Sequence, residues 1–107
     1  MKDKELLYAA IDDYELINRS SKAILKILIS LEGNKEAVIA LSILKLSKMA
    51  KISRNAAYEA IKALENKSFI RKWTENRRFS FFLLQHEKLN YLIQNYCYLE
   101  QKKKYLT

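Results

Sequence analysis

The sequence has little of what bends or crosslinks a chain. Its 107 residues include one glycine, one cysteine and no proline. Scarce glycine and proline favour long helices over the many tight turns of a β-sandwich or barrel. The single cysteine, Cys97, cannot form an intrachain disulfide, which is typical of a reducing compartment. We therefore expect one mainly helical domain over residues 1–107 and a cytoplasmic location.

The sequence also lacks the residue patterns of common catalytic and metal sites. His86 is the only histidine and lies eleven positions from Cys97, so no zinc site is predicted. One glycine cannot build a glycine-rich phosphate loop, and no nucleophile has a convincing base. The N-terminal residues alternate between charged and apolar, which indicates neither a signal peptide nor a membrane span. We predict no enzymatic activity, no cofactor, no metal and no membrane partner.

The chain is strongly basic, and its charge is unevenly distributed. The net charge is +8. Residues 1–41 are almost balanced, whereas residues 42–80 contain ten Lys and Arg against three Asp and Glu. Concentrated positive charge is typical of a surface that binds nucleic acid or another polyanion. An ordinary solvated surface is the alternative, and we favour the polyanion-binding surface.

Apolar spacing predicts a mainly α fold with a small β-hairpin, an α+β class. Ser42 and Ser53 are expected N-caps. Leu46 and Met49 should face inward in the helix after Ser42. Apolar spacing over residues 3–17 predicts a helix at 1–18 that continues to Ile17, and Ser20 or Ser21 is the expected N-cap of a second helix that Gly33 ends. A brief strand or helix lead-in is expected at 38–41, a helix-turn-helix at 42–67, two strands and a polar turn at 69–84, and a helix at 86–104.

The second helix of the 42–67 segment has the residues of a DNA-reading surface. Arg54 and Asn55 follow the cap, and these two residue types read guanine and adenine through paired hydrogen bonds. Tyr58 lies on the same face and offers a hydroxyl or a ring, while Lys62 would reach a backbone phosphate. The opposite face should be buried, through Ala57, Ala60, Ile61 and Leu64.

The stretch LSKMAKISRNAAYEAIKALENKSFIRK and the later RRFSFFLL resemble the winged helix-turn-helix families, including MarR-like and PadR-like regulators. Plasmid-partition adaptors share this module. The resemblance implies that the second helix enters the major groove and that the hairpin acts as a wing. The implied DNA contacts are Ser53, Arg54, Asn55 and Tyr58 in the groove and Arg77 and Arg78 in the wing.

Two departures from that resemblance concern the turns. These families usually have glycine where this chain has Lys51 and Ser68, so turns of a different shape are expected there. Trp73 and Phe79 are interpreted as hairpin core rather than as base-stacking residues.

A homodimer is expected because a single recognition helix contacts few base pairs. The last helix has a wider apolar surface than a small core needs, and the alternative is that it packs only on its own core. The expected interface residues are Leu89, Leu92, Ile93, Tyr96 and Leu99.

Three functions fit these features. The leading hypothesis is a dimeric, sequence-specific regulator of transcription, a repressor, that binds double-stranded DNA. The alternative is a plasmid or viral partition or replication adaptor that binds a centromere-like array and captures a partner ATPase or GTPase. The third is a winged-helix module that contacts only proteins.

Overall fold

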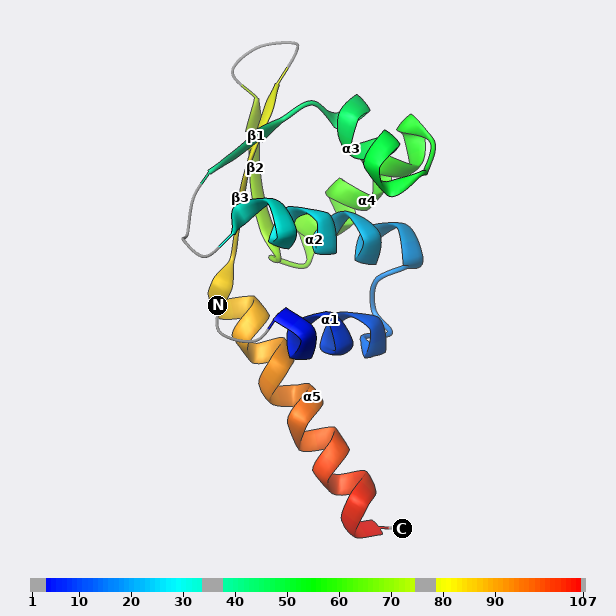
Figure 1. The fold of residues 1–107 in the computed structure, drawn as a ribbon, viewed down its shortest axis with the longest axis vertical. Helices are drawn as coiled ribbons and strands as arrows, with labels where there is room; N and C mark the ends of the chain where they lie inside the picture. Colours follow the sequence, from blue (N-terminus) through cyan, green and yellow to red (C-terminus); the bar gives the residue numbers. More distant parts are fainter. Residues whose placement is uncertain (1–3, 34–37, 75–78, 107) are drawn as a thin grey trace.

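The computed structural model describes residues 4–33, 38–74 and 79–106, with side chains described as far as residue 103 (Figure 1). The elements, in chain order, are α1 (Lys4–Asp13), α2 (Arg19–Glu32), β1 (Ile39–Leu41), α3 (Ile43–Ala50), α4 (Arg54–Asn66), β2 (Ile70–Thr74), β3 (Ser80–Leu84) and α5 (His86–Leu106). The fold is the predicted α+β class, mainly helical with a small sheet, and it is winged-helix-like. None of the described helices has the length and apolarity that crossing a membrane requires.

The sheet has three antiparallel strands in the order β1-β3-β2. The hairpin β2–β3 pairs Ile70 with Leu84 and Trp73 with Phe81. Residues 38–41, expected as a brief strand or a lead-in, contain β1, which pairs Ile39 with Phe82 on the other edge of β3. β1, which precedes the helix-turn-helix in the chain, therefore adds a third strand to the predicted hairpin.

The core lies between α2, α4 and one side of the sheet. Every predicted inward residue of α4 is buried. The α2–α4 crossing is close because Ser21, which is fully buried, donates its hydroxyl to the carbonyl oxygen of Ala60 at 3.4 Å. Phe69 is also fully buried and meets the Tyr14 ring edge-on, with centroids 5.6 Å apart. Lys88 Nζ lies 5.3 Å from the centroid of the Phe69 ring.

The first helix is shorter than the apolar spacing predicts. It ends at Asp13, and the Tyr14 N–H then donates to the Ile11 carbonyl at 3.2 Å. Two adjacent carboxylates at the C-terminal end oppose the helix dipole, which disfavours further turns. Ile17 is buried nonetheless, because the turn returns it to the core. The prediction of a helix continuing to Ile17 was therefore wrong about the backbone and right about burial of that side chain.

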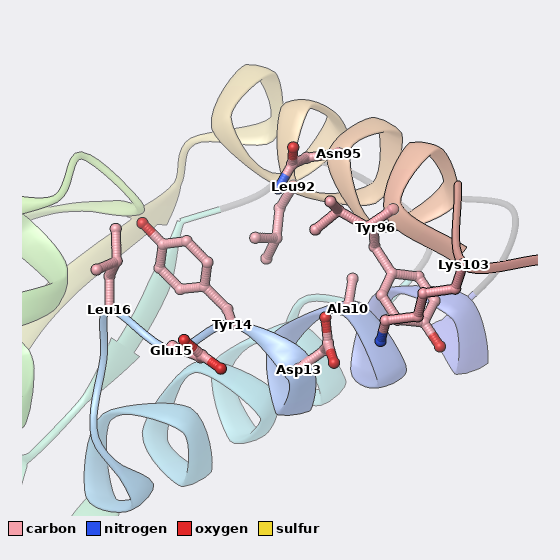
Figure 2. A pocket seen from close by; sticks show the side chains of 10 residues that line it. Ala10, Asp13, Tyr14, Glu15, Leu16, Leu92, Asn95, Tyr96 and Lys103 are labelled. Atoms are coloured by element: carbon pink, nitrogen blue, oxygen red, sulfur yellow. The ribbon is translucent and has the colours of Figure 1, made fainter. Parts of the chain in front are cut away.

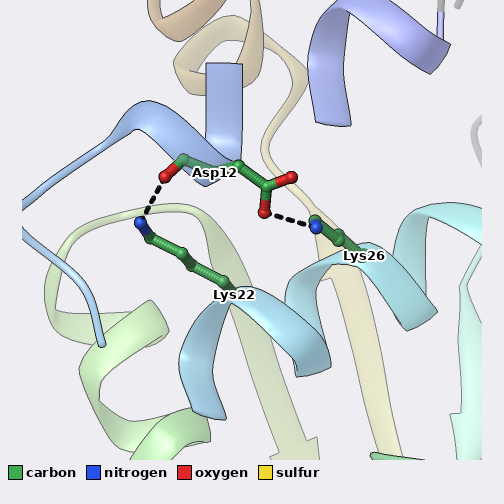
Figure 3. A network of polar contacts seen from close by, with 3 residues as sticks. All are labelled: Asp12, Lys22 and Lys26. Atoms are coloured by element: carbon green, nitrogen blue, oxygen red, sulfur yellow. Dashed lines mark hydrogen bonds and ion pairs between the residues drawn. The ribbon is translucent and has the colours of Figure 1, made fainter. Parts of the chain in front are cut away.

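Asp12 ties the end of α1 to α2. Its carboxylate forms an ion pair with Lys26, and its carbonyl oxygen accepts a hydrogen bond from Lys22 Nζ at 2.6 Å (Figure 3). The cap of α2 is Asn18, whose Oδ1 accepts the N–H of Ser21 at 2.9 Å. The predicted caps, Ser20 and Ser21, were wrong because both residues already lie in the first turn. Gly33 ends α2 at a positive φ of 76°, as predicted.

The two turns that lack glycine keep a left-handed backbone. Lys51, at the end of α3, has φ 57°, and Ser68, after α4, has φ 65°. The expectation of differently shaped turns was wrong. At the first turn the Ile52 N–H donates to the Ser47 carbonyl at 3.0 Å, and at the second the Phe69 N–H donates to Leu64 at 3.0 Å. These bonds hold a conformation that costs a residue with a Cβ about 1–2 kcal/mol.

Replacing Ser68 with glycine is expected to stabilise the fold by about 1 kcal/mol, because glycine adopts this φ without the Cβ clash. Lys67→Gly is the matched control, since φ at Lys67 is −91° and glycine gains nothing there. Urea unfolding of both variants measures the effect. A loss of stability in Ser68→Gly would show that the left-handed turn is not strained.

Candidate nucleic-acid interface

Two capped helices and a short connection present the candidate interface. Ser42 Oγ accepts the Lys45 N–H at 3.1 Å and starts α3, while Ser53 Oγ accepts the Ala56 N–H at 3.1 Å and starts α4. Both predicted caps are therefore confirmed. Ser47, which is buried, and Ala57, which is fully buried, are small residues on the packed faces of α3 and α4. Ile52 packs against the core from the connection.

The outward face of α4 holds the residues that the sequence singled out. Arg54, Asn55 and Lys62 are exposed, and the Tyr58 side chain is 44% exposed. None of these four side chains makes a hydrogen bond or ion pair with another described residue. Glu59 is exposed beside them, and carboxylates are able to accept a hydrogen bond from the amino group of cytosine. The first two turns of α4 therefore present donors and acceptors that the fold does not use.

The helix before the connection adds cations that sequence reasoning did not name as contacts. Lys45, Lys48 and Lys51 are all exposed. Met49, predicted to face inward, is 42% exposed, because the short helix α3 buries only Ile43, Leu46 and Ser47. The spacing of the basic residues in 42–51 is the sequence signal for this second basic surface.

The start of α2 lies beside the connection between α3 and α4. Arg19 and Ser20 line a hollow of about 430 Å³ together with Ala50, Lys51 and Ile52. This arrangement brings Arg19, from the charge-balanced part of the chain, next to a lysine of the basic part. No sequence signal could place it there, since the contact depends on how α2 packs across the core.

The hairpin differs from the prediction in the side chains that it exposes. Trp73 and Phe79, interpreted as hairpin core, are 37% and 47% exposed. Trp73 lies on the side of the sheet away from the core, where it stacks on Phe81 with centroids 5.9 Å apart, and Phe79 directly precedes β3. Arg77 and Arg78, the predicted wing contacts, lie outside the described residues.

Most of the residues of α5 that were predicted to form the dimer interface pack against the core of the same chain. Leu89 is fully buried and Leu92 is 3% exposed, while Ile93 and Tyr96 pack partly against the core. Of the five expected interface residues, Leu99 is the one whose side chain is exposed. The contacts that bury the others come from the chain itself, chiefly where α5 packs on α1. His86 Nε2 anchors the start of α5 to Glu32 Oε2 at 2.9 Å.

A groove of about 350 Å³ runs between α5 and the turn after α1 (Figure 2). Asp13, Glu15 and Leu16 line it from the turn, and Asn95 and Lys103 line it from α5. Tyr14 lies at its side, where burial and, to a lesser degree, the neighbouring Tyr91 raise the pKa of the Tyr14 hydroxyl. The Tyr14 hydroxyl is therefore neutral near pH 7.

Histidine, cysteine, aspartate and glutamate do not gather into a metal-binding group anywhere in the described parts of the chain. His86, the only histidine, has a structural hydrogen bond to Glu32.

Comparisons with known proteins bear on the fold. No protein-family model matches the chain, and no curated protein is significantly similar to it. A solved structure from Methanosarcina mazei Go1, described as a possible transcriptional regulator, is similar with a TM-score of 0.57. The match covers 99% of this chain and 87% of that one, at 13% identity. At this level of identity the similarity shows a shared overall fold.

Proposed function

We propose that this protein binds double-stranded DNA, with the N-terminal half of α4 in the major groove. The observation that carries the proposal is the exposed α4 face, whose polar side chains have no partner among the described residues. An arginine and an asparagine at the start of a capped helix match the base edges that a recognition helix reads. The positive end of the helix dipole favours nearby phosphate.

The surrounding cations give the expected backbone contacts. Lys62 lies farther along α4, Lys45 and Lys48 lie on α3, and Arg19 and Lys51 meet at the hollow beside the connection. In helix-turn-helix proteins the first helix of the motif crosses the DNA backbone. Here α3 is that first helix, so it would lie across the backbone. The wing, through Arg77 and Arg78, would touch the adjacent minor groove or backbone. Phosphate contacts fix the register, and Arg54, Asn55 and Tyr58 would read the sequence.

We further propose that binding regulates transcription by repression. The M. mazei neighbour, described as a possible transcriptional regulator, supports a regulatory role in general. Sequencing the DNA that co-precipitates with the protein in its own cells tests this role. Scattered sites near promoters are the expected result. A tandem array with spreading would instead show a partition adaptor, and no enriched DNA would contradict both.

The protein is proposed to act as a homodimer through the distal half of α5. This half extends beyond α1, the element on which α5 packs (Figure 1). Tyr98 is 61% exposed and Leu99 is exposed near it, and across the groove Leu16 is 64% exposed. A helix end without tertiary packing is marginal in water, so a partner surface would stabilise it. Two-fold pairing would also match the symmetry of a palindromic site.

Replacing Tyr98 with glutamate is expected to weaken the dimer about thirtyfold or more, because a charge would enter a central apolar contact. Sedimentation velocity at micromolar concentration measures the shift from dimer to monomer. Asn90→Glu is the matched control, because residue 90 is exposed and lies about two turns before Tyr98, outside the distal half of α5. A wild-type protein that sediments as a monomer, or equal effects of the two variants, would contradict this interface.

A further inference from the structure

The side of the sheet that faces away from the core carries a cluster of apolar and aromatic side chains. Register and strand alternation put Ile39, Phe82 and Lys72 on the core side. The opposite side, which we name the outer sheet face, has Ala40, Arg71, Trp73, Phe81 and Leu83, with Phe79 two residues before Phe81.

None of these side chains is buried. Trp73 and Phe79 are 37% and 47% exposed, Ala40 and Arg71 are exposed, and Phe81 and Leu83 are half-buried. Single exposed apolar residues need no explanation, but a contiguous apolar patch marks a contact surface. The outer sheet face is such a patch, and the described helices leave its aromatic rings accessible to solvent.

The rings are ordered in a way that suits a flat ligand. Trp73 and Phe81 lie opposite one another in register, with ring planes 19° apart. Such a pair is held by the strands before any ligand arrives, so little side-chain entropy is lost on binding. Nucleobases stack on aromatic side chains displayed by sheets in this manner, largely without regard to sequence.

The charged residues of the strands favour an anionic ligand. The three strands contain two charged residues, Arg71 and Lys72, and no carboxylate. Arg71 lies two residues from Trp73 on the same face, about 7 Å along the strand. That spacing lets a guanidinium reach the phosphate of a nucleotide whose base contacts the Trp73 ring. A ligand that is both planar and anionic fits this surface better than an apolar protein segment, which would leave Arg71 without a partner.

We propose that the outer sheet face binds single-stranded nucleic acid, with an unpaired base on the exposed rings of Trp73 and Phe79 and its phosphate on Arg71. This site is separate from the α4 surface and does not depend on duplex binding. It would let the protein hold one strand where a duplex beside its site is open.

Trp73 is the only tryptophan of the chain, so its fluorescence reports directly on this face. Titration with an oligothymidylate of about ten nucleotides is expected to quench the emission in a saturable way. Phe79→Leu, which keeps an apolar side chain and removes a ring, should weaken that binding about 5- to 100-fold. Arg71→Gln should weaken it and reduce its salt dependence. Lys102→Gln is the charge-matched control at the exposed end of α5. An oligouridylate arm distinguishes RNA from DNA as the ligand.

Several results would overturn this inference. Emission that is unchanged at saturating oligonucleotide, or an unaltered affinity in Phe79→Leu, would show that the rings do not stack on bases. If Phe79 only stabilises the hairpin, Phe79→Leu should lower the Tm and leave the affinity unchanged. Thermal unfolding of this variant measures the Tm. Emission that changes with protein concentration alone would show that a second copy covers the face. Arg54→Ala should leave oligothymidylate binding intact, so duplex binding by α4 and this proposal can fail separately.

Discussion

Alanine at position 54 should weaken binding to the preferred duplex by about 1–3 kcal/mol, which is roughly 5- to 100-fold in Kd. Arg54 is exposed in the first turn of α4, just after the Ser53 cap, and no described residue pairs with its guanidinium. An arginine at that position of a recognition helix can bind both O6 and N7 of one guanine. The variant should therefore also lose preference at one base pair of the site, which a panel of single-base substitutions in the duplex would detect by fluorescence anisotropy.

The control is Lys102→Ala, which removes the same charge from the far end of α5 (Figure 1). It should change the affinity little. If Arg54→Ala weakens binding to all duplexes equally and keeps the base preference, Arg54 contacts phosphate and its side chain does not read a base. If both variants weaken binding equally, net charge alone governs the affinity.

Replacing Phe69 with alanine should destabilise the fold by about 3–5 kcal/mol. Phe69 is fully buried where the α4–β2 turn, Tyr14 and Lys88 meet, so its loss leaves a cavity and removes two ring contacts. In a chain of this size the Tm should fall by about 10–25 °C. Differential scanning calorimetry measures the change.

Phe79→Ala is the matched control for that prediction, because it removes the same ring from a side chain that is 47% exposed. Its Tm should fall far less. A similar loss in both variants would mean that the hairpin, rather than the buried junction at Phe69, limits the stability.

The local chemistry of the sequence predicted the helices of the 42–67 segment well. Caps depend on a side chain and the backbone a few residues away, so Ser42 and Ser53 could be recognised from the sequence. The buried face of α4 also follows from spacing, since a helix buries every third or fourth residue. The exposed face, with Arg54 and Asn55, was identified for the same reason.

What the sequence did not predict depends on contacts between distant segments. Arg19 and Lys51 line the same hollow because α2 crosses the core, and no local pattern encodes that crossing. Lys51 and Ser68 adopt left-handed conformations because backbone hydrogen bonds on either side stabilise them, although glycine would suit both positions better. Trp73 is a large apolar residue of the kind that cores usually bury, but its pairing with Phe81 of β3 puts it on the outer side of the sheet.

We propose that this protein binds double-stranded DNA through α4 and the cations around it. The most direct test is the association constant for one duplex, measured over a range of salt concentrations. Lys45, Lys48, Lys51 and Lys62 are exposed on that surface, so log K against log salt should fall with a slope of about −4 or steeper. A flat plot, or no measurable duplex binding at low salt, would show that α4 and its cations do not bind duplex DNA.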